Sequence, residues 1–360
     1  MIDNTDLFSQ AMQLARAGDA AEAAQLYRNI LENQPNHLAA AKALADLVET
    51  GRADGDAAAA RIRAKAIEAE STYKVGRTAQ SLSRYDVARR CYLKVLDLDP
   101  DHGDAIWGLA EASYADDEMT EALRWYRAYL DKNPGNPEAL HMVAALGGGP
   151  APLRASDAYV RETFDHFAEN FDKQLLEDLD YRAPALVHDL YCRACPDAHE
   201  NLDILDAGCG TGLSGVDFRP HARRLVGVDL SPEMLKIAKA RGIYDELLEE
   251  EIAACLRARA GSFDLVTAAD VFCYIGDLGE TLAAAALALR SGGHLVFSVE
   301  AQTRRGYALT RSGRYAHKPA YVRKAAQKAG FREVLGVQDR LRTEYGEPVT
   351  GYLTVMRKTG

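Results

Sequence analysis

The stretch Leu202–Gly212 reads LDILDAGCGTG, and it decides how the C-terminal part of the chain folds. Apolar positions lead to Asp206, and a glycine-rich turn with the spacing G-x-G-x-G follows at once. Glycine lets the backbone pass close to a ligand where a Cβ atom would collide. The helix that such a turn opens presents its first amides to negative charge. The pattern therefore predicts a strand, a turn and a helix that hold a ligand at the turn.

A second strand-like run, Leu225–Val228, ends in Asp229. In Rossmann-type folds, a glycine turn followed by an acidic residue after the next strand holds the adenosine part of a cofactor, with the carboxylate on the ribose hydroxyls. Binding of a dinucleotide requires G-x-G-x-x-G, whereas the turn Gly208–Gly212 has its glycines at every second position. The spacing therefore favours an adenosine-containing cofactor other than a dinucleotide. An α/β domain with a glycine turn and no ligand is the alternative.

The D-x-G-C-G-T-G form resembles the first motif of class I S-adenosylmethionine-dependent methyltransferases. Further segments that resemble this family follow in the right order: Asp229–Leu235, Phe263–Val266 with Ala269–Val271, and Leu289–Val296. The resemblance covers roughly residues 155–358. It implies an α/β Rossmann-like methyltransferase domain with a seven-stranded, mostly parallel sheet and S-adenosylmethionine as the cofactor. The last strand, Gly351–Met356, is then antiparallel, and Gly330 and Phe331 precede the sixth.

The resemblance also implies which residues bind the cofactor. They are Asp206, Gly208, Cys209, Gly210 and Gly212 near the methionine part, Asp229 on the ribose, Leu230 and Glu251 near the adenine, and Asp270 near the exit toward the acceptor. Glu251 stands where the family usually has aspartate. It comes shortly after the element Gly242-Ile243-Tyr244-Asp245-x-Leu247, which occurs in a bacterial group with repeats ahead of the methyltransferase domain. The human methyltransferase-like protein of the Williams–Beuren region is similar here. A solvated acidic helix start is the alternative for residues 249–251.

The second domain is predicted to begin with a helical stretch, Ala155–Asp180, that contains Phe164-Asp165-x-x-Ala168-x-x-Phe171-Asp172. Many class I methyltransferases that act on small molecules have a similar pattern in a helix that folds over the cofactor. On that resemblance Phe164, Phe171 and Tyr159 shield the sulfonium from water. The alternative is a helix that packs its aromatic stripe on the sheet.

Methyl transfer needs an aligned, desolvated acceptor, and a general base only where the acceptor carries a proton. Residues that could serve are Asp270, Tyr274, His294, Tyr315 and His317. We take His317 and Tyr274 as catalytic candidates and Arg314 and Tyr315 as substrate-binding candidates. Residues 301–330 carry eight Lys and Arg and no Asp or Glu. These cations either line an anion site, with Arg314 as the best candidate, or form a solvated flank.

A repeat of 34 residues organises the first part of the chain, since Ala88 and Ala122, Tyr92 and Tyr126, and Pro100 and Pro134 are all 34 apart. An earlier copy has Ala23, Tyr27 and Pro35, which leaves room for one degenerate repeat around 38–68. The copies resemble tetratricopeptide (TPR) repeats, which stack into an α-helical solenoid. We therefore predict TPR-like repeats with a capping helix over 1–146, a Gly/Pro linker over 147–153 and the methyltransferase domain over 154–360.

Composition and sequence motifs restrict which partners, cellular location and metal sites are expected. The net charge of −10 argues against broad binding to phosphate backbones. After Asp270 the chain reads Val271–Tyr274 and lacks the motif N/D-P-P-Y/F of DNA adenine methyltransferases, so no DNA partner is expected. No apolar run approaches the roughly 18 residues that span a bilayer, and the protein is expected to be cytoplasmic. No metal is expected either, because Cys192-x-x-Cys195 lacks a second pair or a histidine cluster to complete a zinc site.

Three functions remain open. The first is methyl transfer to a small molecule, with the TPR repeats mediating protein interaction or dimerisation. The second is methylation of a protein or peptide that the TPR groove recruits. The third is a TPR interaction scaffold whose cofactor-binding domain is not catalytic.

Overall fold

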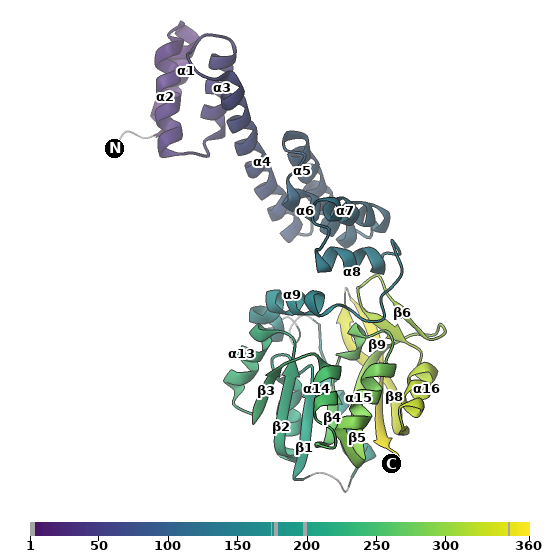
Figure 1. The fold of residues 1–360 in the computed structure, drawn as a ribbon. Helices are drawn as coiled ribbons and strands as arrows, with labels where there is room; N and C mark the ends of the chain where they lie inside the picture. Colours follow the sequence, from purple (N-terminus) through teal and green to yellow (C-terminus); the bar gives the residue numbers. More distant parts are fainter. Residues whose placement is uncertain (1–3, 174, 176–178, 197–199, 345) are drawn as a thin grey trace. The chain divides into compact units, whose positions relative to one another are not determined.

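The computed structural model describes the whole chain except residues 1–3, 174, 176–178, 197–199 and 345. The chain divides into two compact units, Met1–Pro134 and Gly135–Gly360 (Figure 1). The first unit is all helical and the second is α/β, as the sequence predicts. Among the described residues, no helix combines the length and the apolar character that crossing a membrane requires.

The first unit consists of seven helices in the described part of the chain. They are α1 (Asn4–Ala17), α2 (Ala20–Asn33), α3 (Leu38–Glu49), α4 (Ala57–Ser81), α5 (Tyr85–Leu98), α6 (Gly103–Ala115) and α7 (Met119–Lys132). The alanine and tyrosine that recur in each copy of the repeat are buried in α2, α5 and α7. The ring of Tyr92 lies between two glycines of neighbouring helices: an added Cβ on Gly76 or Gly108 would come within 2.8 or 2.6 Å of it. These small residues explain how the helices approach closely enough to stack.

Helix α4 joins the degenerate repeat to the next one. No proline occurs between Pro35 and Pro100, so no proline stops a helix where the degenerate repeat should end. As a result, α4 runs through 25 residues. Its first part belongs to the repeat predicted around 38–68, and its last part is the first helix of the following repeat.

The second unit is built on a sheet with the strand order β3-β2-β1-β4-β5, all parallel. The strands are β1 (Leu202–Ala207), β2 (Ala222–Asp229), β3 (Glu246–Glu249), β4 (Phe263–Ala268) and β5 (Leu289–Ala301). Next to β5 lies the antiparallel strand β9 (Glu347–Lys358), and β8 (Phe331–Glu344) pairs with β9. These seven strands confirm the predicted sheet and its antiparallel last strand.

A short hairpin, β6 (Tyr307–Leu309) and β7 (Tyr315–His317), adds two strands that the sequence analysis did not anticipate. Strand β7 pairs with the end of β5 at Glu300 and Ala301. The hairpin occupies the segment in which the acceptor-binding candidates lie, so it decides where their side chains point.

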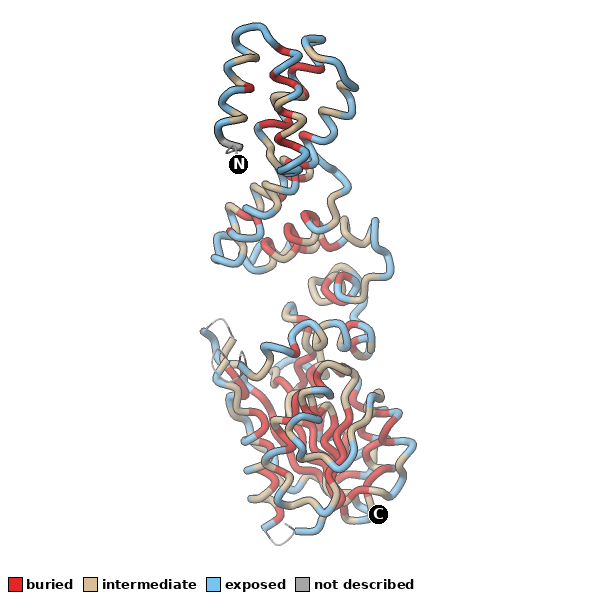
Figure 2. The backbone as a smooth tube through the Cα atoms, turned by 90° about the vertical axis from the view of Figure 1, so that its left-hand side faces the viewer, coloured by how far each residue is buried: buried red, intermediate tan, exposed pale blue. Residues whose placement is uncertain are grey.

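Helices cover both faces of the sheet, and the buried positions follow its strands (Figure 2). One core contains residues of α14 (Ile252–Ala258), α15 (Gly279–Ala288) and α16 (Pro319–Lys328), and the other contains residues of α11 (Ala183–Ala194) and α12 (Leu213–Phe218). This is the three-layer arrangement of a doubly wound α/β fold, in which ligands bind at the carboxyl ends of the strands.

Helix α8 (Pro137–Ala145), which the sequence predicts as the cap of the repeats, lies in the second unit. Its His141 is buried, with Nε2 2.7 Å from the carbonyl oxygen of Gly313, and the ring stacks on Tyr159 at 4.0 Å. The predicted division into 1–146, 147–153 and 154–360 stays a proposal, and it differs from the compact units in where α8 falls.

Candidate functional site

The glycine turn follows β1 and is held against β2. The amides of Gly208 and Cys209 both donate to the carbonyl of Val228, at 2.8 and 3.0 Å. Gly208, Gly210 and Gly212 have φ of 70°, 51° and 94°, which residues with a Cβ rarely adopt. An added Cβ on Gly210 would meet nothing within 4 Å, so this glycine faces open space. The turn is therefore shaped for close approach of a ligand to the backbone.

Asp206 and Asp229 lie at the ends of β1 and β2, next to this turn. Asp229 accepts hydrogen bonds from the amides of Gly210 and Ser231, each at 2.9 Å. Asp206 accepts one from the Tyr244 hydroxyl at 2.7 Å through Oδ2, and its buried Oδ1 has no hydrogen-bond partner among the described residues. Burial raises the pKa of Asp206 to about 7 against the hydrogen bond from Tyr244, and burial also raises the pKa of Asp229. A buried acceptor without a donor is unfavourable, so this site fits a ligand that brings donors.

The element around Tyr244 positions Asp206, a role that the sequence analysis did not assign. Tyr244 packs between α12 and β2: a Cβ on Gly215 would lie 2.2 Å from its hydroxyl oxygen, and one on Gly227 would lie 3.0 Å from its ring. The next residue, Asp245, accepts hydrogen bonds at 2.7 Å from Arg219 and from the amide of Leu225. Tyr244 and Asp245 are the tyrosine and aspartate of the G-x-Y-D-x-L pattern, which is the sequence feature that marks this arrangement.

A single cavity extends from the glycine turn to the ends of β4 and β8. Of the residues predicted for the site, it is lined by Gly208, Cys209, Gly210, Asp229, Leu230, Glu251, Asp270, Phe171, Tyr274 and Arg314. Asp206, Gly212, Tyr315 and His317 are not among its lining residues. The carboxylate of Glu251 also accepts the amides of Ala253 and Ala254 at the start of α14. Its predicted role near the adenine stays a proposal.

His317 and Tyr315 lie in β7 with fully buried side chains that hold the hairpin in place. The Tyr315 hydroxyl donates to the carbonyl of Pro152 at 2.8 Å. The Nε2 atom of His317 lies 3.0 Å from the carbonyl oxygen of Gly276, and the ring stacks on Tyr321. Burial lowers the pKa of His317 to about 4. The structure therefore does not bring these two candidates to the cavity.

The segment with the paired Phe-Asp motif covers the cavity. It comprises α9 (Asp157–Phe167), a 3₁₀ turn and the short α10 (Phe171–Lys173); of the predicted stretch 155–180, residues 174 and 176–178 lie outside the described residues. Phe164 and Phe171 line the cavity with their ring centroids 5.8 Å apart, and Phe164 also contacts Tyr274. Tyr159, in contrast, packs on His141.

The two aspartates of the same motif tie this segment to the cofactor-side loops. Asp165 accepts a hydrogen bond from the Ser231 hydroxyl, at the start of α13 (Pro232–Arg241). Asp172 accepts one from the Thr211 hydroxyl in the glycine turn and pairs with Arg241. Each aromatic residue thus faces the cavity while the aspartate that follows it fixes the segment in place.

Replacing Asp172 with alanine is expected to lower the affinity for S-adenosylmethionine about tenfold, because one lost charged contact of about 1.4 kcal/mol corresponds to that factor. Calorimetric titration with S-adenosylhomocysteine measures the change. Glu169→Ala is the matched control, since Glu169 is an exposed carboxylate in the same segment. Equal affinity of the D172A and E169A variants would contradict an anchoring role.

The far end of the cavity contains a buried charge network that the sequence analysis missed. Arg342 is 1% exposed, and it donates to Asp270 at 2.7 Å, to Glu344 at 2.7 Å and to Glu300. Arg314 pairs with Glu344 as well. A β-bulge between Arg340 and Arg342 in β8 turns Arg342 inward, and bulges often aim a side chain into a site in this way.

Asp270 follows β4 with φ of 58°, a conformation that is uncommon outside glycine and that often occurs at functional sites. Its Oδ2 is paired with Arg342, while its buried Oδ1 has no hydrogen-bond partner among the described residues. Tyr274 is half-buried beside Arg314, and desolvation raises its pKa above the ordinary value. Its hydroxyl therefore stays protonated and acts as a hydrogen-bond donor at neutral pH.

These features define a cofactor-binding Rossmann-like domain of the methyltransferase type. Residues 205–297 match the methyltransferase domain family, and residues 7–37 and 73–137 match tetratricopeptide repeats. The chain is an S-adenosylmethionine-dependent methyltransferase with N-terminal TPR repeats. The glycine turn, Asp229 and the unpartnered Oδ1 of Asp206 fit this cofactor, whose adenosyl hydroxyls and ammonium group supply donors.

Curated proteins of the methyltransferase class are similar to the second unit. The ubiquinone biosynthesis O-methyltransferase of Ralstonia nicotianae is 27% identical over 173 residues, which are 43% of this chain and 71% of that protein. Human methyltransferase-like protein 27 is 41% identical over 112 residues, 31% of this chain and 43% of that protein, so less than half of the human relative is spanned. The crystal structure of the 1,6-didemethyltoxoflavin-N1-methyltransferase of Burkholderia thailandensis is similar over 59% of this chain and 94% of that chain, with 18% identity and a TM-score of 0.47.

Proposed function

We propose that the chain transfers the methyl group of S-adenosylmethionine to a small molecule that enters the cavity at its Asp270 and Arg314 end. The observation that carries this proposal is the continuous cavity itself, which reaches from the glycine turn to this end and is covered by Phe164 and Phe171. The curated relative from Ralstonia nicotianae also bears a name that states O-methylation in ubiquinone biosynthesis.

The residues at the acceptor end suit a polar acceptor. The free Oδ1 of Asp270 can accept a hydrogen bond from a hydroxyl or amino group, and the Tyr274 hydroxyl can donate one. Arg342 holds Asp270 in place, and Arg314 offers a positive charge at the cavity wall. The cofactor supplies an activated methyl group, so the chain's task is to orient the acceptor and exclude water.

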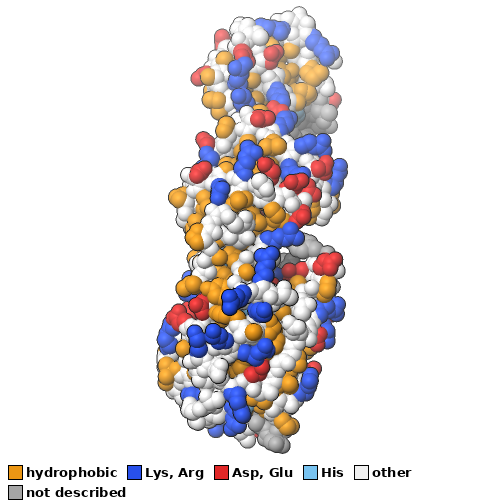
Figure 3. Space-filling view, turned by 90° about the vertical axis from the view of Figure 1, so that its right-hand side faces the viewer, with side chains coloured by type: hydrophobic (Ala, Val, Ile, Leu, Met, Phe, Trp, Pro, Cys, Tyr) orange, Lys and Arg blue, Asp and Glu red, His pale blue; other side chains and the backbone are white. Residues whose placement is uncertain are grey.

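The basic run over 301–330 separates into two parts in the structure. Arg314 lines the cavity and Lys318 is half-buried outside it, whereas the other six are exposed: Arg304, Arg305, Arg311, Arg323, Lys324 and Lys328. Figure 3 views the molecule from the side of β6 and α16 and shows blue side chains spread over this face. We therefore assign an anion-binding role to Arg314 alone and regard the rest as a solvated flank.

A second function, methylation of a protein recruited by the repeats, is favoured by a hollow on the TPR unit. This hollow is lined by charged residues and by Trp125, over which the Arg124 guanidinium lies at 4.7 Å. TPR solenoids present such surfaces to partners. For the small-molecule reaction, the repeats then mediate protein interaction or dimerisation.

Incubation of the full-length chain with methyl-labelled cofactor and cell extract distinguishes the two. We expect label in the low-molecular-mass fraction, and we expect a variant with Arg90→Glu and Trp125→Ala in the hollow to transfer it equally well. Label found in proteins alone, and lost in that variant, would support recruitment of a protein substrate instead. Cofactor binding without label in either fraction would indicate the scaffold.

Cofactor affinity is expected to rise about tenfold between about pH 5.5 and 7. The buried Asp206 carboxyl, with its pKa raised to about 7, is largely protonated at the lower pH, while the ammonium of the cofactor favours the carboxylate. Binding therefore releases a proton, and affinity increases with pH until Asp206 is ionised before binding. Calorimetric titration with S-adenosylhomocysteine across this range measures the effect.

Two variants separate Asp206 from other titrating groups. Asp206→Asn should flatten the pH profile, apart from any residual slope that belongs to Asp229. Tyr244→Phe removes the hydrogen bond that lowers the pKa of Asp206, so the rise should move to higher pH. A D206N variant with the slope of the wild type would refute the assignment.

A further inference from the structure

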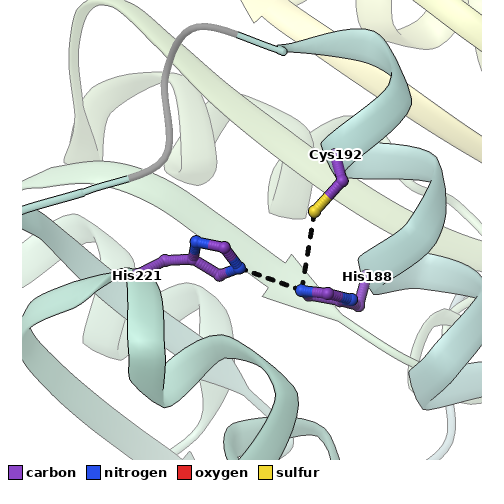
Figure 4. A group of neighbouring side chains, drawn as sticks. All are labelled: His188, Cys192 and His221. Atoms are coloured by element: carbon purple, nitrogen blue, oxygen red, sulfur yellow. Dashed lines mark hydrogen bonds between the residues drawn. The ribbon is translucent and has the colours of Figure 1, made fainter.

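Three potential metal ligands that are far apart in the sequence converge on the surface of the second unit. His188 and Cys192 lie one turn apart in α11, and His221 ends the 3₁₀ turn Arg219–His221 that leads into β2. The Nε2 atoms of the two histidines are 2.9 Å apart, and the Cys192 Sγ lies 3.5 Å from Nε2 of His188 (Figure 4). One ligand atom from each residue lies within 4.8 Å of the others.

These separations are close to those around a bound zinc ion. With Zn–N of about 2.0–2.1 Å and Zn–S of about 2.3 Å, the ligand atoms of a tetrahedral site lie about 3.3–3.6 Å apart. Figure 4 shows the two Nε2 atoms and the sulfur directed toward one another from two elements. Thiolate with imidazole is the donor set that selects Zn²⁺ and similar borderline ions over Mg²⁺ or Ca²⁺.

The elements that carry the three residues are fixed by their own contacts. The Arg219 guanidinium bonds the carbonyls of Ile243 and Ala222 at 3.0 and 3.1 Å, which holds the 3₁₀ turn against β2. Phe218 is fully buried and contacts the ring of His188 at 5.3 Å. The ligands are therefore positioned in advance, and little order has to be gained on binding a metal.

A carboxylate lies near the other ring nitrogen of His188. Oδ1 of Asp189 lies 3.6 Å from Nδ1 of His188, on the side of the ring opposite to the cluster. Carboxylates that accept a hydrogen bond from this nitrogen orient metal-bound histidines, and Asp189 stands at ion-pair distance from it. All three ligands are partly exposed, so an ion can reach them from solvent.

We propose that His188, Cys192 and His221 bind Zn²⁺ or a similar borderline divalent ion, with the thiolate and two imidazoles as ligands and water in the fourth position. The Cys192 thiol releases its proton to solvent on binding. The site joins α11 to the 3₁₀ turn that follows α12, the helix that the glycine turn opens, so the metal stabilises the support of the cofactor site. The sequence suggested no histidine cluster because His221 is distant from the other two along the chain.

Titration of the untagged, chelator-treated full-length chain with Zn²⁺ tests the proposal. We expect one ion per chain and a rise in melting temperature of about 5 °C or more at a hundredfold excess over the dissociation constant. With Co²⁺, a thiolate-to-metal charge-transfer band should appear. Cys192→Ser should remove that band, and His221→Gln should weaken Zn²⁺ binding at least tenfold.

His166→Ala is the control, because His166 is an exposed histidine outside the cluster and its loss should change nothing. Circular dichroism of each variant shows whether it folds. The C192S and H221Q changes are near-isosteric, so they remove a metal ligand with little change in packing. Absence of stoichiometric binding would overturn the proposal, as would equal Zn²⁺ affinity of wild type, C192S and H221Q. The three residues would then form a hydrogen-bonded cluster only.

Discussion

Replacing Asp229 with alanine is expected to lower the affinity for S-adenosylmethionine at least a hundredfold and to abolish methyl transfer at ordinary cofactor concentrations. A carboxylate at the end of β2 binds both ribose hydroxyls in this class of fold. Each hydrogen bond to a charged group contributes about 1.5–3 kcal/mol, so the loss of two amounts to about 3 kcal/mol or more. Calorimetric titration with S-adenosylhomocysteine measures the affinity directly.

Glu249→Ala is the matched control for the loss of a carboxylate at this edge of the sheet. Glu249 ends the neighbouring strand β3, is exposed and does not line the cavity. Asp229 also accepts the amides of Gly210 and Ser231, so the Asp229→Asn variant, which retains one acceptor oxygen, separates loss of the ribose contacts from disorder of the turn. Cofactor affinity within threefold of wild type in the D229A variant would disprove this placement of the ribose.

The cofactor end of the site could be predicted because its information is local. The glycine turn, Asp206 and Asp229 each stand next to the strand that positions them, and the spacing alone puts them at the carboxyl edge of a parallel sheet. The paired Phe-Asp motif is local in the same sense, since its two aromatic residues and two aspartates lie on one short segment.

The acceptor end could not be predicted because its residues meet only through tertiary structure. Arg342 reaches the cavity through a β-bulge that inserts one residue into β8, and nothing in the alternation of the sequence marks that insertion. The sequence predicts His317 and Tyr315 as candidates because they follow β5, but the hairpin of β6 and β7 turns both into the core. The same limit applies to His221, whose partners in α11 precede it by a strand and a helix.

Replacing Arg342 with alanine is expected to destabilise the second unit by about 3–5 kcal/mol. Its guanidinium is 1% exposed and is the shared partner of Asp270, Glu300 and Glu344, so its removal leaves buried carboxylates without their main counter-charge. Among the described residues, Arg314 remains paired with Glu344 and lies 3.9 Å from Glu300. Urea unfolding, followed by circular dichroism in the absence of cofactor, gives the change in the free energy of unfolding.

Arg340→Ala provides the comparison within the same strand. Arg340 pairs with Asp180, but both side chains are largely exposed, and such a pair contributes about 0–1 kcal/mol. Because the loss in R342A comes from uncompensated negative charge, a second change of Glu300→Gln in that variant should restore part of the stability, whereas Glu300→Gln alone should destabilise the protein. If the effects of the two changes on the free energy of unfolding simply add, Arg342 and Glu300 contribute independently. Equal stability of R342A and R340A would mean that the buried network does not support the acceptor end.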